Sequence, residues 1–159
     1  MNDIPKSGAV APASLMRSES DLPFVEFDEG ITFQLLHVNP VSDTFVVRVR
    51  FEPGITIPRH EHTGEVFAFT HAGAWRYLEY PEVNRKGSYL YEPAGAIHTL
   101  HVLDDNQGLT DVSFVVHGKN LNLDEDGNVE SELGLESMLE LYCERCQELG
   151  LPVPDVIGA

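Results

Sequence analysis

Apolar and polar residues alternate along most of the chain between residues 24 and 118. In TFVVRVRF, Phe45, Val47 and Val49 point to one face of an extended strand, whereas Arg48 and Arg50 point to the other. Further segments of this kind are ITFQLLHV, TIPRHEHT, EVFAFTHA, AWRYLEY, SYLYEP, IHTLHVL and LTDVSFVVHG. Turns rich in Gly, Pro, Asn and Asp separate them. The pattern predicts an all-β fold, a sandwich or barrel of the jelly-roll kind.

The two ends of the chain differ from this strand-rich centre. Residues 1–22 are polar, contain proline and show no periodicity, so we expect a flexible N-terminal arm or an exchanged edge segment. Residues 23–159 are predicted to form one domain, because 159 residues are too few for two ordinary cores. Near its end, LGLESMLELYCERCQELG has the period of an amphipathic helix, which we expect at about residues 133–149.

Cys143 and Cys146 form a CxxC pair within this predicted helix. A second CxxC pair, which a zinc site of four cysteines requires, is missing from the sequence, and no βαβ pattern surrounds the first as in a thioredoxin-like motif. We therefore interpret both as ordinary free thiols, which suits a reducing, cytoplasmic setting.

The formal net charge of −16 limits the partners to be expected. Nucleic acids and anionic membrane surfaces would repel such a chain, so neither is predicted. The sequence also lacks an apolar run of the roughly 18 to 20 residues that a membrane span needs, and its N-terminus lacks the apolar region of a signal peptide. These features predict a cytoplasmic protein.

His60 and His62 are the first candidates for chemistry. In a strand, residues two positions apart lie on one face about 6.5 Å apart, so both imidazoles are able to bind one metal ion while Glu61 faces away. The alternative is a pair of surface histidines. A second histidine segment, GSYLYEPAGAIHTLH, favours the metal site because it supplies His98 from another strand.

These two segments resemble the two sequence motifs of the cupin superfamily. GITIPRHEH, followed by Gly73, matches the first motif, and GSYLYEPAGAIH matches the second except that Val102 stands where the motif ends in Asn. The resemblance covers roughly residues 30 to 118 and implies a single-domain cupin jelly-roll β-barrel with one C-terminal helix. It also implies that His60, His62 and His98 are metal ligands.

The chain departs from the cupin pattern at the fourth ligand. Many cupins have a glutamate there, at the position of Val66 or Phe67, neither of which binds metal. Glu65 is one residue away, and only a β-bulge would turn it to the same face. We therefore favour three neutral imidazoles, which leave the +2 charge of the ion uncompensated and favour an anionic, oxygen-chelating substrate. Imidazoles suit Fe, Zn, Cu and Ni, so the ligand types do not identify the metal.

A narrower resemblance suggests an activity. GITFQLLHV, the three histidines and AWRYLEYPEVNRKGSYLYEPAGAIHTL are similar to a small cupin family of non-haem iron dioxygenases that includes 2,4′-dihydroxyacetophenone dioxygenase and acetylacetone dioxygenase. The resemblance implies an Fe(II) cofactor, with Zn, Ni or Mn as other ions to consider. It implies a ketone substrate and O2, which together give two carboxylic acids by cleavage of a C–C bond beside a carbonyl. Glu92, six residues before His98, would be the catalytic residue of the outer shell.

Two other functions remain open on the sequence. One is a zinc-binding sensor that regulates a partner, as in anti-sigma-factor cupins, although those have a further helical domain. The other is a non-redox isomerase or hydrolase that uses Zn or Mn.

The other four histidines are not expected to bind the metal. His37, His71 and His117 are interpreted as structural, and His101 as lying at the pocket rim. Because the sheets of this fold have open edges, we expect a homodimer or homotetramer.

Overall fold

The computed structural model describes residues 11–159. Its strands are β1 (Val25–Asp28), β2 (Ile31–Asn39), β3 (Thr44–Phe51), β4 (Thr56–His62), β5 (Val66–Ala72), β6 (Ala74–Tyr77), β7 (Asn84–Arg85), β8 (Tyr89–Glu92), β9 (Ile97–Val102), β10 (Thr110–His117), β11 (Asn120–Leu123) and β12 (Val129–Leu133). A single helix of the described residues, α1, spans Leu135–Glu148, close to the predicted 133–149.

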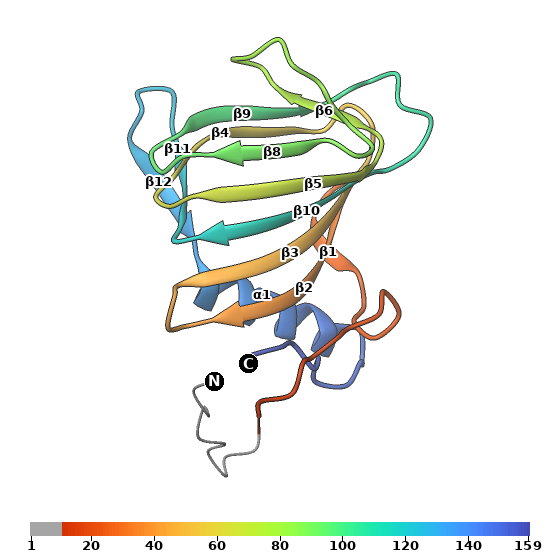
Figure 1. The fold of residues 1–159 in the computed structure, drawn as a ribbon. Coiled ribbons are helices and arrows are strands. Elements are labelled where there is room, and N and C mark those ends of the chain that lie inside the picture. The colour runs from red at the N-terminus through yellow and green to blue at the C-terminus, as the bar shows by residue number, and fades with distance from the viewer. Residues whose placement is uncertain (1–10) are drawn as a thin grey trace, which may run out of the picture.

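The strands form two antiparallel six-stranded sheets (Figure 1). One sheet has the order β1-β2-β3-β10-β5-β8 and the other β12-β11-β4-β9-β6-β7. The chain passes from the first sheet to the second between β5 and β6, at Gly73. This residue has φ +78°, and a Cβ atom there would lie 2.6 Å from Cα of Thr110, so glycine is required on both counts. The arrangement confirms the predicted all-β jelly-roll domain.

Apolar side chains fill the space between the sheets. In β3 the predicted alternation holds, because Phe45, Val47 and Phe51 are buried between the sheets. Arg48 and Arg50 lie on the other face, where both form ion pairs with Asp111 of β10. The inner residues form two clusters, one around Trp75 under β6 and β9 and the other beside α1.

Helix α1 packs against β1 and β2 below the first sheet (Figure 1). Its buried side chains are Leu135, Met138, Tyr142 and Cys146. Tyr142 is fully buried, packs on Phe33 with ring centroids 5.3 Å apart, and donates a hydrogen bond to the Pro23 carbonyl. Both cysteines are free thiols, Cys143 half-buried and Cys146 buried, as interpreted from the sequence.

The predicted N-terminal arm lies partly outside the described residues, which begin at residue 11. Within the described part, Arg17 forms an ion pair with Asp155, and Leu22 is buried against the core. No described helix is long and apolar enough to cross a membrane. The predicted homodimer or homotetramer stays a prediction.

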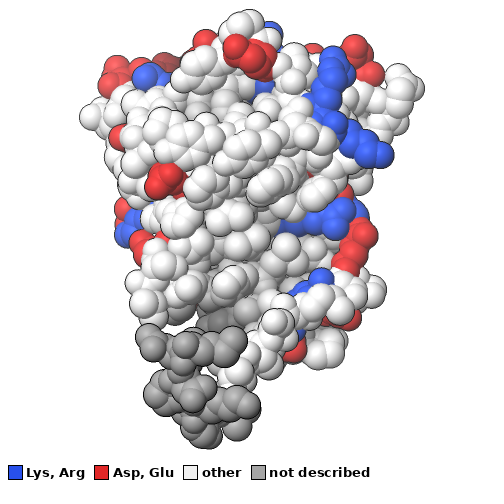
Figure 2. All heavy atoms as spheres, in the orientation of Figure 1, with Lys and Arg blue, Asp and Glu red and all other residues white. Residues whose placement is uncertain are grey.

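The face of the molecule turned to the viewer in Figure 2 has few charged side chains across its middle, although the net charge is −16. Exposed aromatic residues of β5 and β8 include Phe69, Tyr89 and Tyr91. Phe69 and Tyr89 lie side by side, with ring centroids 5.3 Å apart, on adjacent strands.

Substitution of Tyr142 tests how firmly α1 is anchored to the sheet. We expect Tyr142→Phe to lower the free energy of unfolding by about 1 kcal/mol, because the partly buried Pro23 carbonyl loses its donor. Tyr142→Ala removes the packing on Phe33 as well and should cost about 3–5 kcal/mol. Urea unfolding followed by circular dichroism measures both changes. Tyr80→Ala, at a half-exposed position, is the control and should change stability by no more than about 0.5 kcal/mol.

Candidate metal centre

Three buried histidines meet on the inner face of the second sheet. His60 and His62 come from β4 and His98 comes from β9, and each of the three is less than 9% exposed. His60 and His98 are direct partners in the antiparallel pairing of these two strands. Side chains of directly paired residues lie next to each other on one face, so the register itself brings the predicted ligands together.

A β-bulge in β4 makes this convergence possible. The pairing of Ile57 with Leu100 is followed by that of His60 with His98, so Pro58 and Arg59 stand opposite the single residue Thr99. The bulge reverses the alternation, and Ile57, His60 and His62 therefore all face inward. Pro58, which has no N–H to donate, accepts a hydrogen bond at its carbonyl from His60 Nδ1 at 2.7 Å.

The ligand nitrogens of the three rings lie within 4.8 Å of one another. Because Pro58 engages Nδ1 of His60, Nε2 of this ring faces the centre. Nε2 of His62 and of His98 both face Oε2 of Glu92, at 3.3 and 3.6 Å. His98 Nε2 is fully buried and has no hydrogen-bond partner in the described structure.

Burial keeps the three imidazoles neutral. Desolvation lowers the pKa of His60, and it lowers the pKa of His62 to about 3 and that of His98 to about 2. The neighbouring imidazoles add to the last two shifts, because positive charges at this distance repel. Neutral imidazole is the form that binds metal, and an unpartnered nitrogen in the cluster needs a partner. The donor set therefore fits a divalent transition-metal ion.

Glu92 lies beside the cluster, on the inner face of β8, and is only 3% exposed. Its Oε1 accepts a hydrogen bond from the Tyr77 hydroxyl, whereas Oε2 has no hydrogen-bond partner. Burial raises the pKa of the Glu92 carboxyl to about 7, against the opposing effect of the Tyr77 hydrogen bond. The Tyr77 ring stacks on the His98 ring, with centroids 3.6 Å apart and an interplanar angle of 9°.

The residues at the fourth-ligand position lie where the sequence suggested. Val66 is fully buried on β5 and is the direct partner of Glu92 on β8. Glu65 is exposed, and its backbone carbonyl accepts a hydrogen bond from His117. The carboxylate closest to the histidines thus comes from β8, the strand next to the position of Val66.

Other histidines lie outside the cluster. His101 contacts Thr56 and lies 3.4 Å from Asp104, and His71 contacts Ser113 on the outer face. His117 contacts the Glu65 carbonyl, and His37 forms a backbone bridge with Ile157. Within the described residues, His60, His62 and His98 are the one group of three that could hold a metal ion.

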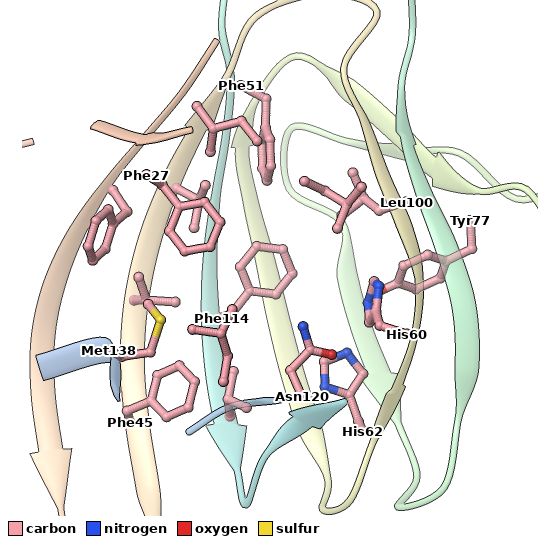
Figure 3. A pocket seen from close by; sticks show the side chains of 17 residues that line it. Phe27, Phe45, Phe51, His60, His62, Tyr77, Leu100, Phe114, Asn120 and Met138 are labelled. Carbon is pink, nitrogen blue, oxygen red and sulfur yellow. The ribbon is translucent and has the colours of Figure 1, made fainter. Parts of the chain in front are cut away.

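A cavity of about 140 Å³ opens between the two sheets next to His60 and His62 (Figure 3). The polar members of its wall are His60, His62, Tyr77 and Asn120, and the rest are apolar, among them Phe45, Phe51, Phe114 and Met138. Figure 3 shows the histidines, Tyr77 and Asn120 together on one side, with Phe27, Phe45 and Met138 on the other. The described wall includes no charged Lys, Arg, Asp or Glu side chain.

Asn120 and Tyr77 are functional-site residues that the sequence motifs do not indicate. Tyr77 has the same strand parity as the buried Trp75, which indicates an inward side chain but not its contact with Glu92. Asn120 pairs with His62 across β11 and β4, a register that nothing in the sequence indicates.

Comparison with known proteins places the chain among cupins. The family model of the ChrR cupin-like domain matches residues 13–119. A protein of unknown function with a cupin-like fold from Ralstonia eutropha JMP134 is 31% identical, with a TM-score of 0.86 over 95% of this chain and 96% of that one. No curated protein matches the sequence.

Two solved structures of known proteins share the fold at lower identity. The acetylacetone dioxygenase of Acinetobacter johnsonii is 19% identical, with a TM-score of 0.72 over 90% of this chain and 99% of that one. The Rhodobacter sphaeroides anti-sigma ChrR, in complex with SigE, is 17% identical, with a TM-score of 0.50 over 64% of this chain and 51% of that one.

Removal of one predicted ligand tests the metal centre. We expect His98→Ala to weaken binding of Co²⁺ more than 100-fold, beyond the roughly 10- to 100-fold that loss of an outer-shell partner costs. His101→Ala is the matched control, because His101 lies on the same strand but outside the cluster. Isothermal titration with Co²⁺ measures both affinities. Equal binding by the two variants would contradict a site built on His98.

Proposed function

Because the chain belongs to the ChrR cupin-like domain family, we propose that it is a metal-dependent cupin enzyme, a dioxygenase that uses Fe(II) to cleave a C–C bond beside a carbonyl. The observation that carries this proposal is the group of three buried, neutral imidazoles, two of which, His60 and His62, line the polar end of an apolar cavity. The shared fold of the acetylacetone dioxygenase supports it, at an identity of 19%.

His60, His62 and His98 would hold the ion. A bound Fe(II) would supply a Lewis acid for an enolate and a centre at which O2 is activated. The three ligands bring no negative charge, so they favour an anionic chelating ligand over a neutral one. Pro58 holds the His60 ring by its Nδ1, and Tyr77 holds the His98 ring by stacking.

Glu92 is proposed to act on the side chains of Tyr77, His62 and His98 and not on the substrate itself. The cavity wall includes Tyr77 but not Glu92, and Glu92 accepts the Tyr77 hydrogen bond. Its free oxygen borders His62 and His98. We therefore assign Glu92 a positioning role, in which it orients Tyr77 and borders the two imidazoles.

The cavity favours a β-diketone over a 4′-hydroxylated aryl ketone. Its volume of about 140 Å³ is close to that of an engineered cavity of about 150 Å³ that holds benzene, so it has room for little more than one ring. A hydroxyl at the apolar end would be buried without a partner, at a cost of about 1–3 kcal/mol. A compact diketone places both oxygens at the polar end and methyl groups against the apolar wall.

The products follow from atom balance. Cleavage places one oxygen atom of O2 on each of the two carbons that were bonded. For 2,4′-dihydroxyacetophenone this gives two carboxylic acids, hydroxybenzoate and formate. For acetylacetone it gives acetate and a 1,2-dicarbonyl compound, so the pair of acids expected from the sequence applies to the aryl ketone alone.

A metal-binding sensor is the second candidate function. Its support is the family model, which is described by the anti-sigma protein ChrR. This chain covers 51% of that protein's chain. Stoichiometric metal binding without oxygen uptake on any ketone would favour the sensor over the enzyme.

Oxygen uptake by anaerobically purified, Fe(II)-loaded protein tests the enzyme. We expect uptake with acetylacetone that disappears in His98→Ala. For 2-hydroxyacetophenone and 2,4′-dihydroxyacetophenone, which differ by the 4′-hydroxyl, we expect kcat/KM to be about 5- to 150-fold lower for the second ketone, the equivalent of about 1–3 kcal/mol. Faster turnover of 2,4′-dihydroxyacetophenone than of the other two would contradict our reading of the cavity.

Substitution of Glu92 tests its positioning role. We expect Glu92→Gln to lower kcat for acetylacetone roughly 10- to 100-fold, the range for outer-shell partners, with little change in KM. Tyr77→Phe, which keeps the ring on His98 but removes the hydroxyl, should lower kcat in the same direction. Glu61→Gln is the control, because Glu61 lies between His60 and His62 but faces outward. An unchanged kcat in iron-loaded Glu92→Gln would contradict a positioning role for Glu92.

A further inference from the structure

Asn120 lies next to the metal centre and has no role in the function proposed so far. It is the first residue of β11 and the direct antiparallel partner of His62 in β4. Side chains of such partners lie side by side on one face of the sheet. Figure 3 shows the Asn120 amide beside the His62 ring at the polar end of the cavity.

Two complementary atoms of this pair lack hydrogen-bond partners. Oδ1 of Asn120 and Nδ1 of His62 are both fully buried, and neither has a partner in the described structure. Buried polar atoms are nearly always hydrogen-bonded, so two adjacent exceptions indicate a contact that closes when the site is filled. A neutral imidazole that binds metal through one nitrogen carries its proton on the other, and that N–H requires an acceptor.

The other ring from β4 already has such an acceptor. His60 Nδ1 contacts the Pro58 carbonyl at 2.7 Å, which leaves Nε2 for the metal. His62 has no backbone carbonyl in this position, whereas the Asn120 amide lies beside its ring. Asn120 thus stands where His62 needs the equivalent of Pro58.

The Nδ2 group of the Asn120 amide is free to donate a hydrogen bond to a ligand. Of the other polar side chains in the described wall, His60 and His62 belong to the metal site, and the Tyr77 hydroxyl donates its hydrogen bond to Glu92. The hydrogen bonds of the described residues include none from Asn120 Nδ2. This group is an uncommitted donor on the wall of an otherwise apolar cavity.

We propose that Asn120 links the metal ligand His62 to the bound substrate. Its Oδ1 accepts a hydrogen bond from His62 Nδ1–H and fixes that ring as an Nε2 ligand, and its Nδ2 donates to an oxygen of the chelating ketone. The first contact rests on the metal site alone, and the second rests on the proposed function. This arrangement would favour a small dicarbonyl ligand with one oxygen free to accept the hydrogen bond from Asn120 Nδ2.

Anaerobic titration with Co²⁺ tests the first contact. Asn120→Leu, similar in size but without an acceptor, should weaken Co²⁺ binding about 10- to 100-fold. Asn120→Asp keeps an acceptor and should bind at least as tightly as the wild type. The matched control is Asn122→Leu, because Asn122 is the partner of His60 on the same strand but donates to Ser131.

An unchanged Co²⁺ affinity or an equal loss in a comparison variant would overturn this contact. The first result is unchanged Co²⁺ affinity in Asn120→Leu that retains the wild-type circular dichroism and thermal midpoint. The second is an equal loss in Asn120→Leu and Asn120→Asp, or in Asn120→Leu and Asn122→Leu, which would show a general effect of altering β11.

Binding of acetylacetone to the Co²⁺-saturated protein, measured anaerobically by absorbance, tests the second contact. Asn120→Asp lacks the donor and should weaken acetylacetone binding about 3- to 10-fold relative to Asn122→Asp, which carries the same charge on the same strand. Equal affinity in these two variants would overturn the donor role. If the wild type binds no acetylacetone, the proposed diketone function and the donor role both fail, whereas the Co²⁺ titration still decides the contact with His62.

Discussion

The candidate metal centre depends on one irregularity of the second sheet, the bulge at Pro58 and Arg59 in β4. Without it, Ile57 and His60 would face opposite sides of the sheet, since strict alternation separates residues three positions apart. The bulge lets Ile57 line the cavity while His60 and His62 also face inward. The same two residues set the register in which His98 meets His60, and the Pro58 carbonyl holds the His60 ring.

The side chains of the site are buried in their neutral forms, and several of their polar atoms lack hydrogen-bond partners. Desolvation lowers the pKa of all three histidines, so a folded protein near neutral pH holds them uncharged. Nitrogen atoms of His62 and His98 and an oxygen of Glu92 are nevertheless buried without hydrogen-bond partners. Each such atom costs folding free energy, which the surrounding apolar core has to offset. A bound ion would engage the free Nε2 of His98, so its binding and the stability of the fold are expected to be coupled.

The sequence was sufficient for the strands, for the C-terminal helix and for the three histidines, because each rests on a local pattern. Alternation located β3, and the HxH spacing and the motif GSYLYEPAGAIH located the three histidines of the candidate site. The sequence was insufficient to predict contacts that depend on pairing between strands. The Asn120–His62 and Val66–Glu92 partnerships join residues that are 58 and 26 positions apart, as the numbering shows, and no local pattern encodes either register.

The place of the carboxylate separates this site from cupins that bind metal through three histidines and a glutamate. Here the position of that glutamate falls at Val66 or Phe67 on β5, and the nearest carboxylate, Glu92, approaches from the adjacent strand β8. Burial raises the pKa of Glu92 to about 7, and one of its oxygens is engaged by Tyr77. Glu92 thus differs from that fourth ligand both in the strand that carries it and in its hydrogen bond to Tyr77. Because the three histidine ligands are neutral, a metal ion bound by them would keep most of its positive charge for an anionic ligand in the cavity, which is the electrostatic basis for the proposed selection of an enolate.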